Sequence, residues 1–273
     1  MSNLQGLHIV ITRPRAQAEP WAKRLQEMGA KVYILPLMEI VPLQDAAQIH
    51  AIKHCILNFN NYSKAIFVSQ NAVQQGFTWL ENYWPQLPVG VKFFAVGETT
   101  ANLLQSYGVR VTDLAHTQGG AMTSETLVQS PDLQQVMGEK ILIFRGLGGR
   151  NHLGESLSAR GAKVDYCELY KRQLPEFALT QAKQLFQCDL VENSGPNWQR
   201  TVISLHSGEA FTNLISVLNS IGVSESKLKQ LRLLVPSERI ARQAESAGFS
   251  EIYTAENATD TAMLQRLMSI HLT

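Results

Sequence analysis

An internal duplication is the feature of this sequence that most restricts how the chain can fold. The segment 8–40 aligns without a gap with 140–172, at a constant offset of 132 residues, and nine of the 33 positions are identical. We infer that the chain carries two copies of one ancestral design. Two further pairs keep the same order in both halves, namely 64–80 with 201–218 and 92–108 with 232–248.

Each repeated segment predicts a strand followed by a helix. In the first, a β-branched run at 8–11 precedes Trp21, Leu25 and Met28, which recur at helical spacing before Gly29 ends the helix and a new strand begins. Alternating strands and helices with apolar strands are typical of a parallel sheet covered on both faces. With 273 residues available, we expect the α/β class with two doubly wound parallel-sheet domains.

Composition narrows the functional classes. The hydrophobic content of 45% supports substantial cores, and the net charge of +1 argues against a general nucleic-acid surface. Cys55, Cys167 and Cys188 form no closely spaced pair, which suits reduced thiols. The apolar run Leu7–Ile11 is too short for a signal peptide or a membrane span, and no longer one follows. We therefore expect a cytoplasmic protein without membrane contact.

The residues just past each expected strand indicate the kind of ligand, because parallel α/β domains bind ligands beyond the carboxyl ends of their strands. These positions are rich in hydroxyls, glycines and arginines, with Glu98 and Glu238 as the few carboxylates. Helix starts add backbone N–H donors, so the expected ligand is an anion. The positions are Thr12, Arg13, Ser69–Asn71, Gly97–Thr100, Arg145–Arg150, His206–Gly208 and Ser237–Arg239.

The glycine-rich loop Gly146–Arg150 follows the expected strand KILIF, 140–144. The dinucleotide pattern fails because Asn151 stands where its last glycine belongs, and no Lys-Ser/Thr pair completes a phosphate loop. A carboxylate-binding loop and a plain turn with a solvent-facing arginine stay open as interpretations.

Several other residues have structural alternatives. His50 and His54 share one helix face but lack a third metal ligand, so we expect no metal site. His206 ends a strand and is a weak candidate for proton transfer. Ser69, Ser207 and Ser237 are better explained as helix N-caps than as nucleophiles, since the sequence supplies no partner base.

Tyr170 lies just beyond a strand in the segment ELYKR, at the repeat position equivalent to Met38. If the chain passes between domains at these two equivalent points, Tyr170 lies near the domain boundary. The alternative is a structural tyrosine whose hydroxyl is satisfied by the protein.

Taken together, these motifs resemble the uroporphyrinogen-III synthase family over nearly the full length. The opening ITRPRAQAEPWAKRLQEMGAKVYILPLMEI resembles the family's first unit, and FVSQNAV at 67–73 its strand-end Ser-x-Asn segment. AVGETTANLLQSYG at 95–108, the Arg-Gly and Tyr block at 141–172, and the final unit from Pro236 are similar as well. Their order along one chain makes the resemblance specific.

The resemblance implies an interleaved fold. One discontinuous domain would comprise 1–36 with 174–273, the other 43–166, and a two-stranded linker, 37–42 and 167–173, would join them. The duplication alone also allows two consecutive domains, 1–135 and 136–273, and periodicity does not choose between these arrangements.

The implied activity is cyclisation of hydroxymethylbilane with loss of water and inversion of the terminal pyrrole ring. This small-molecule substrate is a linear tetrapyrrole with eight carboxylates, and no metal or organic cofactor is implied. The hydroxyl of the hydroxymethyl group leaves as water to give an electrophilic azafulvene. The substituted position of the terminal ring attacks the azafulvene carbon, and the resulting spiro intermediate fragments and recloses. The only protein partner implied is a transient contact with the preceding pathway enzyme.

The same resemblance implies roles for individual residues. Tyr170 is the expected catalytic residue, because a phenol is protonated at neutral pH and can donate to the departing hydroxyl. The chain departs from the family pattern at one point: Ile240, the repeat equivalent of Thr100, has no hydroxyl group. This departure weakens a ligand-binding role for position 240. The expected substrate-binding residues are Arg13, Ser69, Asn71, Gly97, Thr100, Arg145, Arg150, Ser207, Ser237 and Arg239.

Two other functional classes stay open at this stage. A two-domain chain with few catalytic groups also suits a non-catalytic binding protein for a small anionic ligand. A glycosyl- or phosphate-handling enzyme would need an acidic or metal-binding residue at a strand end, and the sequence shows no convincing candidate.

Overall fold

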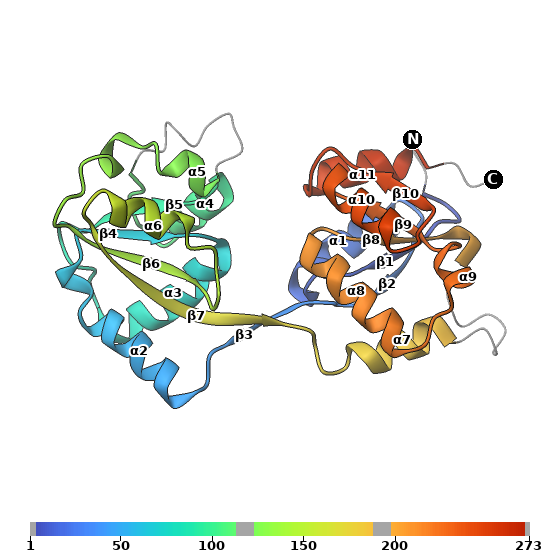
Figure 1. The fold of residues 1–273 in the computed structure, drawn as a ribbon, viewed down its shortest axis with the longest axis horizontal. Helices are drawn as coiled ribbons and strands as arrows, with labels where there is room; N and C mark the ends of the chain where they lie inside the picture. Colours follow the sequence, from blue (N-terminus) through green and yellow to red (C-terminus); the bar gives the residue numbers. More distant parts are fainter. Residues whose placement is uncertain (1–3, 113–122, 188–197, 271–273) are drawn as a thin grey trace. The chain divides into compact units, whose positions relative to one another are not determined.

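The chain divides into two compact units in the computed structural model, which describes residues 4–112, 123–187 and 198–270 (Figure 1). Unit 1 combines Met1–Glu39 with Gln173–Thr273, and unit 2 comprises Ile40–Arg172. Each unit has its own sheet and its own hydrophobic cores. Cys188 lies outside the described residues.

The sheet of unit 1 has five strands, and every pairing within it is parallel. The N-terminal strands pair directly with strands from the C-terminal third, since His8 lies opposite Thr201 in the register. The order across the sheet is β10 (Glu251–Thr254), β9 (Arg232–Val235), β8 (Thr201–Ser204), β1 (His8–Ile11) and β2 (Lys31–Ile34).

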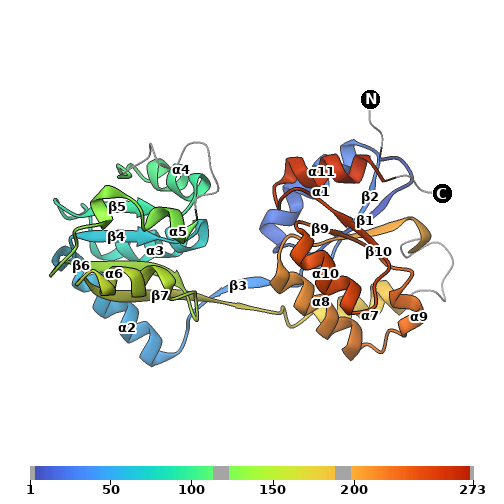
Figure 2. The same cartoon turned by 45° about the horizontal axis from the view of Figure 1, so that its top comes forward.

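Helices cover both faces of this sheet (Figure 2). Side chains of β1 alternate between two cores, with Val10 in one and Ile9 and Ile11 in the other, as expected for a strand buried on both faces. One core contains α1 (Arg15–Glu27) and α11 (Asp260–Met268), and the other contains α7 (Ala178–Gln187), α8 (Gly208–Ser220) and α10 (Glu238–Ser246). A further short helix of this unit, α9, spans Glu225–Leu228.

Unit 2 repeats this architecture. The pairs of β4 with β5, β4 with β6 and β6 with β7 are parallel. The boundary between the units falls within or beside β3 and β7, so these two strands carry the chain from one unit to the other. The order is β3 (Glu39–Pro42), β7 (Lys163–Gln173), β6 (Lys140–Gly146), β4 (Lys64–Phe67) and β5 (Lys92–Ala95).

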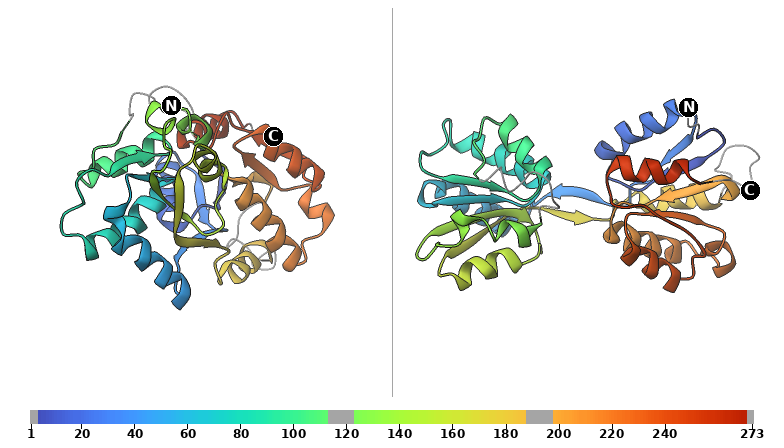
Figure 3. Two further views of the ribbon diagram at one scale, coloured as in Figure 1. Left: turned by 60° about the vertical axis from the view of Figure 1, so that its left-hand side comes forward. Right: turned by 90° about the horizontal axis from the view of Figure 1, so that it is seen from above.

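The helices of unit 2 also lie on both faces of their sheet (Figure 3). The larger core is rich in aromatic rings, and the rings of Phe67 and Phe144 stack with centroids 4.3 Å apart. That core contains α2 (Ala46–Leu57), α3 (Gln70–Tyr83) and α4 (Glu98–Ser106), and the opposite core contains α5 (Ser124–Leu127) and α6 (His152–Ala159).

The duplicated segments occupy equivalent places in the two sheets. Strands β9, β8, β1 and β2 are neighbours in unit 1 in the same order as β5, β4, β6 and β7 in unit 2. The predicted fold class, two parallel α/β domains covered on both faces, is confirmed.

Two predicted strand ends are wrong. Tyr170, expected just beyond a strand, lies within β7. The sequence predicts a strand that ends at Phe144, but β6 continues through Arg145 and Gly146. The reason is that β7 extends far enough to pair with both, placing Arg145 opposite Glu168 and Gly146 opposite Tyr170. The side chain of Arg145 therefore starts from a strand rather than from a loop.

Candidate functional site

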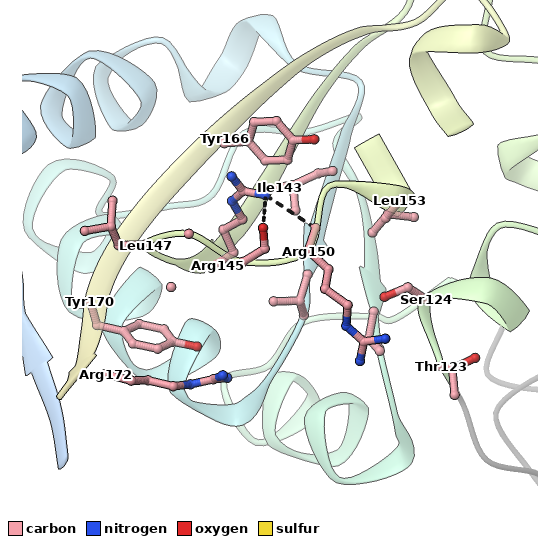
Figure 4. A pocket seen from close by; sticks show the side chains of 15 residues that line it. Thr123, Ser124, Ile143, Arg145, Leu147, Arg150, Leu153, Tyr166, Tyr170 and Arg172 are labelled. Atoms are coloured by element: carbon pink, nitrogen blue, oxygen red, sulfur yellow. Dashed lines mark hydrogen bonds between the residues drawn. The ribbon is translucent and has the colours of Figure 1, made fainter. Parts of the chain in front are cut away.

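A cavity of about 400 Å³ lies at the carboxyl ends of the strands in unit 2 (Figure 4). Side chains from β6 and β7, the loop 146–150, and Thr123 and Ser124 beside α5 line it. Ligands bind at this edge of a parallel sheet because the strand-to-helix loops gather there. The cavity is thus the candidate functional site of unit 2.

Tyr170 forms part of the cavity wall, although its side chain is almost completely buried. The β6–β7 register shifts after Arg145, and this irregularity places Tyr170 opposite Gly146. A Cβ at Gly146 would lie only 2.6 Å from the ring carbon Cε2, so the ring packs directly on the glycine backbone. The phenolic oxygen lies 2.9 Å from the Oγ of Ser69. Packing and this hydrogen bond together fix the phenol.

Arg145, predicted to bind substrate, uses its guanidinium group within the protein. Its Nε and Nη2 donate to Glu168 Oε1 at 3.1 and 2.9 Å. Its Nη1 donates to the carbonyl of Gly149 and to the Oδ1 of Asn151. The group also stacks 3.7 Å from the ring centroid of Tyr166. Arg145 therefore braces the loop 146–150, and little of its donor capacity faces a ligand.

The backbone of the same loop is also engaged. Leu147 N–H donates to the carbonyl of Tyr170 at 2.7 Å, and Gly148 N–H donates to Glu168 Oε1 at 3.2 Å. Gly149 N–H donates to a carbonyl inside the loop. A phosphate-binding loop needs such N–H groups pointing at its ligand. The loop geometry thus argues against nucleotide binding.

Two other arginines line the cavity with exposed side chains. The side chain of Arg150 is 87% exposed, and its ion pair with Glu125, at 3.7 Å, is also exposed. Such a pair contributes little stability, so a ligand carboxylate can replace it at low cost. Figure 4 shows the side chains of Arg150 and Arg172 among those that line the cavity. These two are the cations best placed to meet an anionic ligand in this cavity.

The remaining predicted residues of unit 2 lie around α3 and α4. Ser69 caps α3, with its Oγ accepting the N–H of Ala72, and Asn71 is in the first turn. Gly97 is the N-cap of α4 with a φ of 93°, a conformation that favours glycine. Thr100 is only 3% exposed, and none of these four residues is among those that line the cavity. The structure thus brings Ser69 to Tyr170 but keeps Thr100 inside the fold.

The other predicted residues lie at the carboxyl ends of the strands of unit 1. Arg13 donates to Asp260 Oδ1 at 2.5 Å. Ser207 caps α8 through its hydroxyl, whereas Ser237 is the N-cap of α10 without a side-chain cap bond. The guanidinium of Arg239 lies against the start of α8. These four residues belong to unit 1, whereas the residues that line the cavity belong to unit 2.

His206 lies two residues past β8, half-buried and edge-on to the ring of Trp21, and both of its ring nitrogens are shielded from solvent. Neither of its ring nitrogens has a hydrogen-bond partner among the described residues. Burial, assisted by the positive charge of Arg13, lowers the pKa of His206 to about 3. His206 is therefore neutral at physiological pH, which argues against proton transfer by this residue.

Several site residues escaped the sequence reasoning, among them Tyr166, Glu168 and Arg172. These three lie on β7, spaced two apart with Tyr170 between the last two, and this period of two was the available signal. The acidic partners of two predicted arginines were missed as well, because Glu168 lies inside β7 and Asp260 begins α11. Both carboxylates are distant in sequence from the arginine that they neutralise.

The described part of the chain has neither a metal-binding cluster nor a helix that could span a membrane. Across residues 4–112, 123–187 and 198–270, no cluster of three or more His, Cys, Asp or Glu side chains could hold a metal ion. Over the same ranges, no helix combines the length and apolar character that crossing a membrane requires.

Comparisons with known proteins point to one family. The profile of the uroporphyrinogen-III synthase HemD family matches residues 19–265. The uroporphyrinogen-III synthase of Escherichia coli is 33% identical over 265 residues, covering 96% of this chain and all of that protein. The Salmonella typhimurium synthase is 34% identical with the same coverage. The Helicobacter pylori uroporphyrinogen-III synthetase structure aligns over 97% of this chain and 100% of its own, with a TM-score of 0.60 and 17% identity.

The half-buried His206 predicts a specific pH dependence of stability. Its pKa is about 3 in the folded protein, against 6.5 as the ordinary value. The stabilisation from keeping it neutral is complete above pH 6.5 and is lost as the pH falls toward 3. Between pH 8 and pH 5 we expect about 2 kcal/mol of this loss. Urea unfolding of the parent and H206Q at several pH values measures it, with exposed His50→Gln as control. An H206Q profile parallel to that of the parent would contradict the prediction.

Gly146 predicts a steric effect on the same site. In G146A the new methyl group would collide with the Tyr170 ring at 2.6 Å, and the ring must move. We expect a loss of about 1–3 kcal/mol in the free energy of unfolding. Gly208→Ala is the matched control, because its methyl would meet only the flexible end of Arg239 at 3.3 Å. Equal urea midpoints for the two variants would refute the close packing of Tyr170 on Gly146.

Proposed function

The chain belongs to the uroporphyrinogen-III synthase family, and we propose that it cyclises hydroxymethylbilane with loss of water and inversion of the terminal pyrrole ring. Its class is thus a cyclising lyase of porphyrin biosynthesis. The match to the Escherichia coli synthase spans the whole of that protein. In this proposal the cavity of unit 2 holds the reacting part of the substrate.

The charges around the cavity support a substrate with many carboxylates. Arg150 and Arg172 line it with exposed side chains, and guanidinium groups bind carboxylates through paired hydrogen bonds. The exposed Leu147 adds an apolar surface on which a pyrrole ring can rest. A volume of about 400 Å³ suits one portion of a tetrapyrrole rather than its full length. Arg13 and Arg239 stay predicted carboxylate-binding residues of unit 1.

The position of Tyr170 is the observation that carries the mechanism. Its buried ring holds the phenol on the cavity wall, where it can donate a proton to the hydroxyl of the substrate's hydroxymethyl group. The carbon–oxygen bond then breaks, water leaves, and the substrate becomes an azafulvene. The terminal ring attacks that carbon, forms the spiro intermediate, fragments and recloses. The carbon that closes the macrocycle finally loses a proton, which restores the phenol.

Geometry supplies most of the catalysis in this scheme. The bilane also cyclises unaided, without ring inversion, so the protein has to favour one approach of the terminal ring over another. Holding reacting groups in such a geometry can contribute several kcal/mol. The rigid wall formed by Gly146, Tyr170 and the Arg145 network fits that requirement.

The proposed reaction also bears on cellular context. We infer a cytoplasmic location from the composition and from the reduced state of the buried Cys55 and Cys167. The reactive bilane favours a transient contact with the enzyme that supplies it. A non-catalytic protein that binds a small anion is the competing function, and turnover decides between them.

The proposed activity predicts the isomer that forms. Purified protein is mixed with freshly generated hydroxymethylbilane, the products are oxidised, and the porphyrin isomers are separated. We expect the III isomer to predominate. If only the I isomer forms, at the rate measured without protein, the chain is not a synthase and the binding protein becomes the better explanation.

Tyr170→Phe tests the proton donor in the same assay. The variant keeps the ring that packs on Gly146 but removes the proton, so we expect kcat to fall about 100-fold. The KM should change little, because the arginines that bind carboxylates are intact. Tyr83→Phe, at an exposed tyrosine on α3, is the matched control. An unchanged kcat in Y170F would remove Tyr170 from the mechanism.

A further inference from the structure

We propose that Ser69 is a positioning residue for the reaction: its hydroxyl donates a hydrogen bond to the oxygen of Tyr170 and turns the phenolic hydrogen toward the cavity. This inference rests on the proposed function, in which Tyr170 donates a proton to the substrate. It assigns Ser69 a role different from substrate binding, because the described contacts of its hydroxyl are both within the protein.

The contact joins two elements that are far apart in sequence. Ser69 lies between β4 and α3, and Tyr170 lies on β7, yet the two oxygens are 2.9 Å apart. Ser69 is held by its role as N-cap, since its Oγ accepts the N–H of Ala72 at 3.1 Å. Tyr170 is held by its packing on Gly146. Neither side chain can move away without breaking a second contact, so the pair has a fixed geometry.

The capping bond of Ser69 favours one direction of this hydrogen bond, in which Ser69 donates. The Oγ of Ser69 already accepts an N–H from the start of α3, and a hydroxyl that accepts one hydrogen bond becomes a better donor of another. If Ser69 donates to Tyr170, the phenolic hydrogen is left to point at the substrate. The donated bond then also stabilises the negative charge that grows on the phenolic oxygen as its proton leaves. The reverse direction would direct that hydrogen away from the substrate.

Unit 1 shows that the serine cap does not by itself require such a partner. Ser207 caps α8 with the same geometry, its Oγ accepting the N–H of Ala210 at 3.1 Å. The repeat position equivalent to Tyr170 is Met38, which has no hydroxyl. The cap is common to both units, whereas the link from a capping serine to a phenol belongs to unit 2. A role in the reaction accounts for that difference.

Three substitutions at position 69 separate donation from capping. Threonine keeps both the cap and the donor, so S69T should retain the parental kcat. Alanine loses both, and S69A should lower kcat about tenfold with an unchanged KM. Aspartate caps helices well but can only accept from the phenol, so S69D should be as stable as the parent and as slow as S69A. The readouts are kcat and KM with hydroxymethylbilane and the free energy of unfolding in urea.

Asp45→Ala is the control for capping alone. Asp45 caps α2 in the same unit, accepts two backbone N–H groups and is remote from the cavity lining. D45A should therefore lose stability about as much as S69A while keeping the parental kcat. If S69A and D45A have the same kcat, or if S69D turns over as fast as the parent, the proposed donation is overturned.

A double-mutant cycle with Tyr170→Phe completes the test. Because Ser69 acts through the phenolic oxygen, S69A should lower kcat no further once that oxygen is absent. A tenfold loss that persists in the Y170F background would overturn the positioning role and leave the proposed proton donor intact. If Y170F alone turns over like the parent, the proton donor itself is wrong, and the role of Ser69 falls with it.

Discussion

The pairing of β6 with β7 is the interaction on which the candidate site depends. Up to Arg145 the two strands keep one register, which sets Arg145 beside Glu168 and brings Tyr166 within stacking distance. Beyond that point the register shifts, and Tyr170 comes to lie on Gly146. A bulge changes which way side chains point after it. The regular part of this pairing therefore places the ion pair that supports the loop, and the irregularity places the phenol on the cavity wall.

The sequence predicts the general organisation well because the relevant signals are local or repeated. The duplication and the period of each segment predict two parallel sheets, and the three repeat pairs occupy equivalent strands. The rule for parallel sheets also predicts where functional side chains should be sought. Arg145 and Arg150 were found in this way, whereas Tyr170 was found from its repeat position and the family resemblance, and all three line the cavity.

The partners of these residues could not be predicted, since they depend on contacts between distant parts of the chain. From the sequence, Arg145 is a good candidate to bind a substrate carboxylate. In the structure its guanidinium group instead binds Glu168, 23 residues later. Ser69 and Tyr170 are separated by 101 residues. The burial of His206 is likewise a tertiary effect, because Trp21 comes from the other end of the chain. Charge and spacing alone do not show whether a donor is already occupied.

The duplicated scaffold explains how one chain can combine binding with chemistry. Both units place a capped helix and an arginine at the carboxyl edge of a parallel sheet, as the caps of Ser69 and Ser207 show. Such an edge suits anions whatever the reaction, because it depends on the fold. The equivalent repeat positions hold Met38 in one unit and Tyr170 in the other, so the proposed proton donor is present in one copy only. In the proposed mechanism this phenol needs an oriented partner, and Ser69 can be that partner because its role as helix cap already holds it in place.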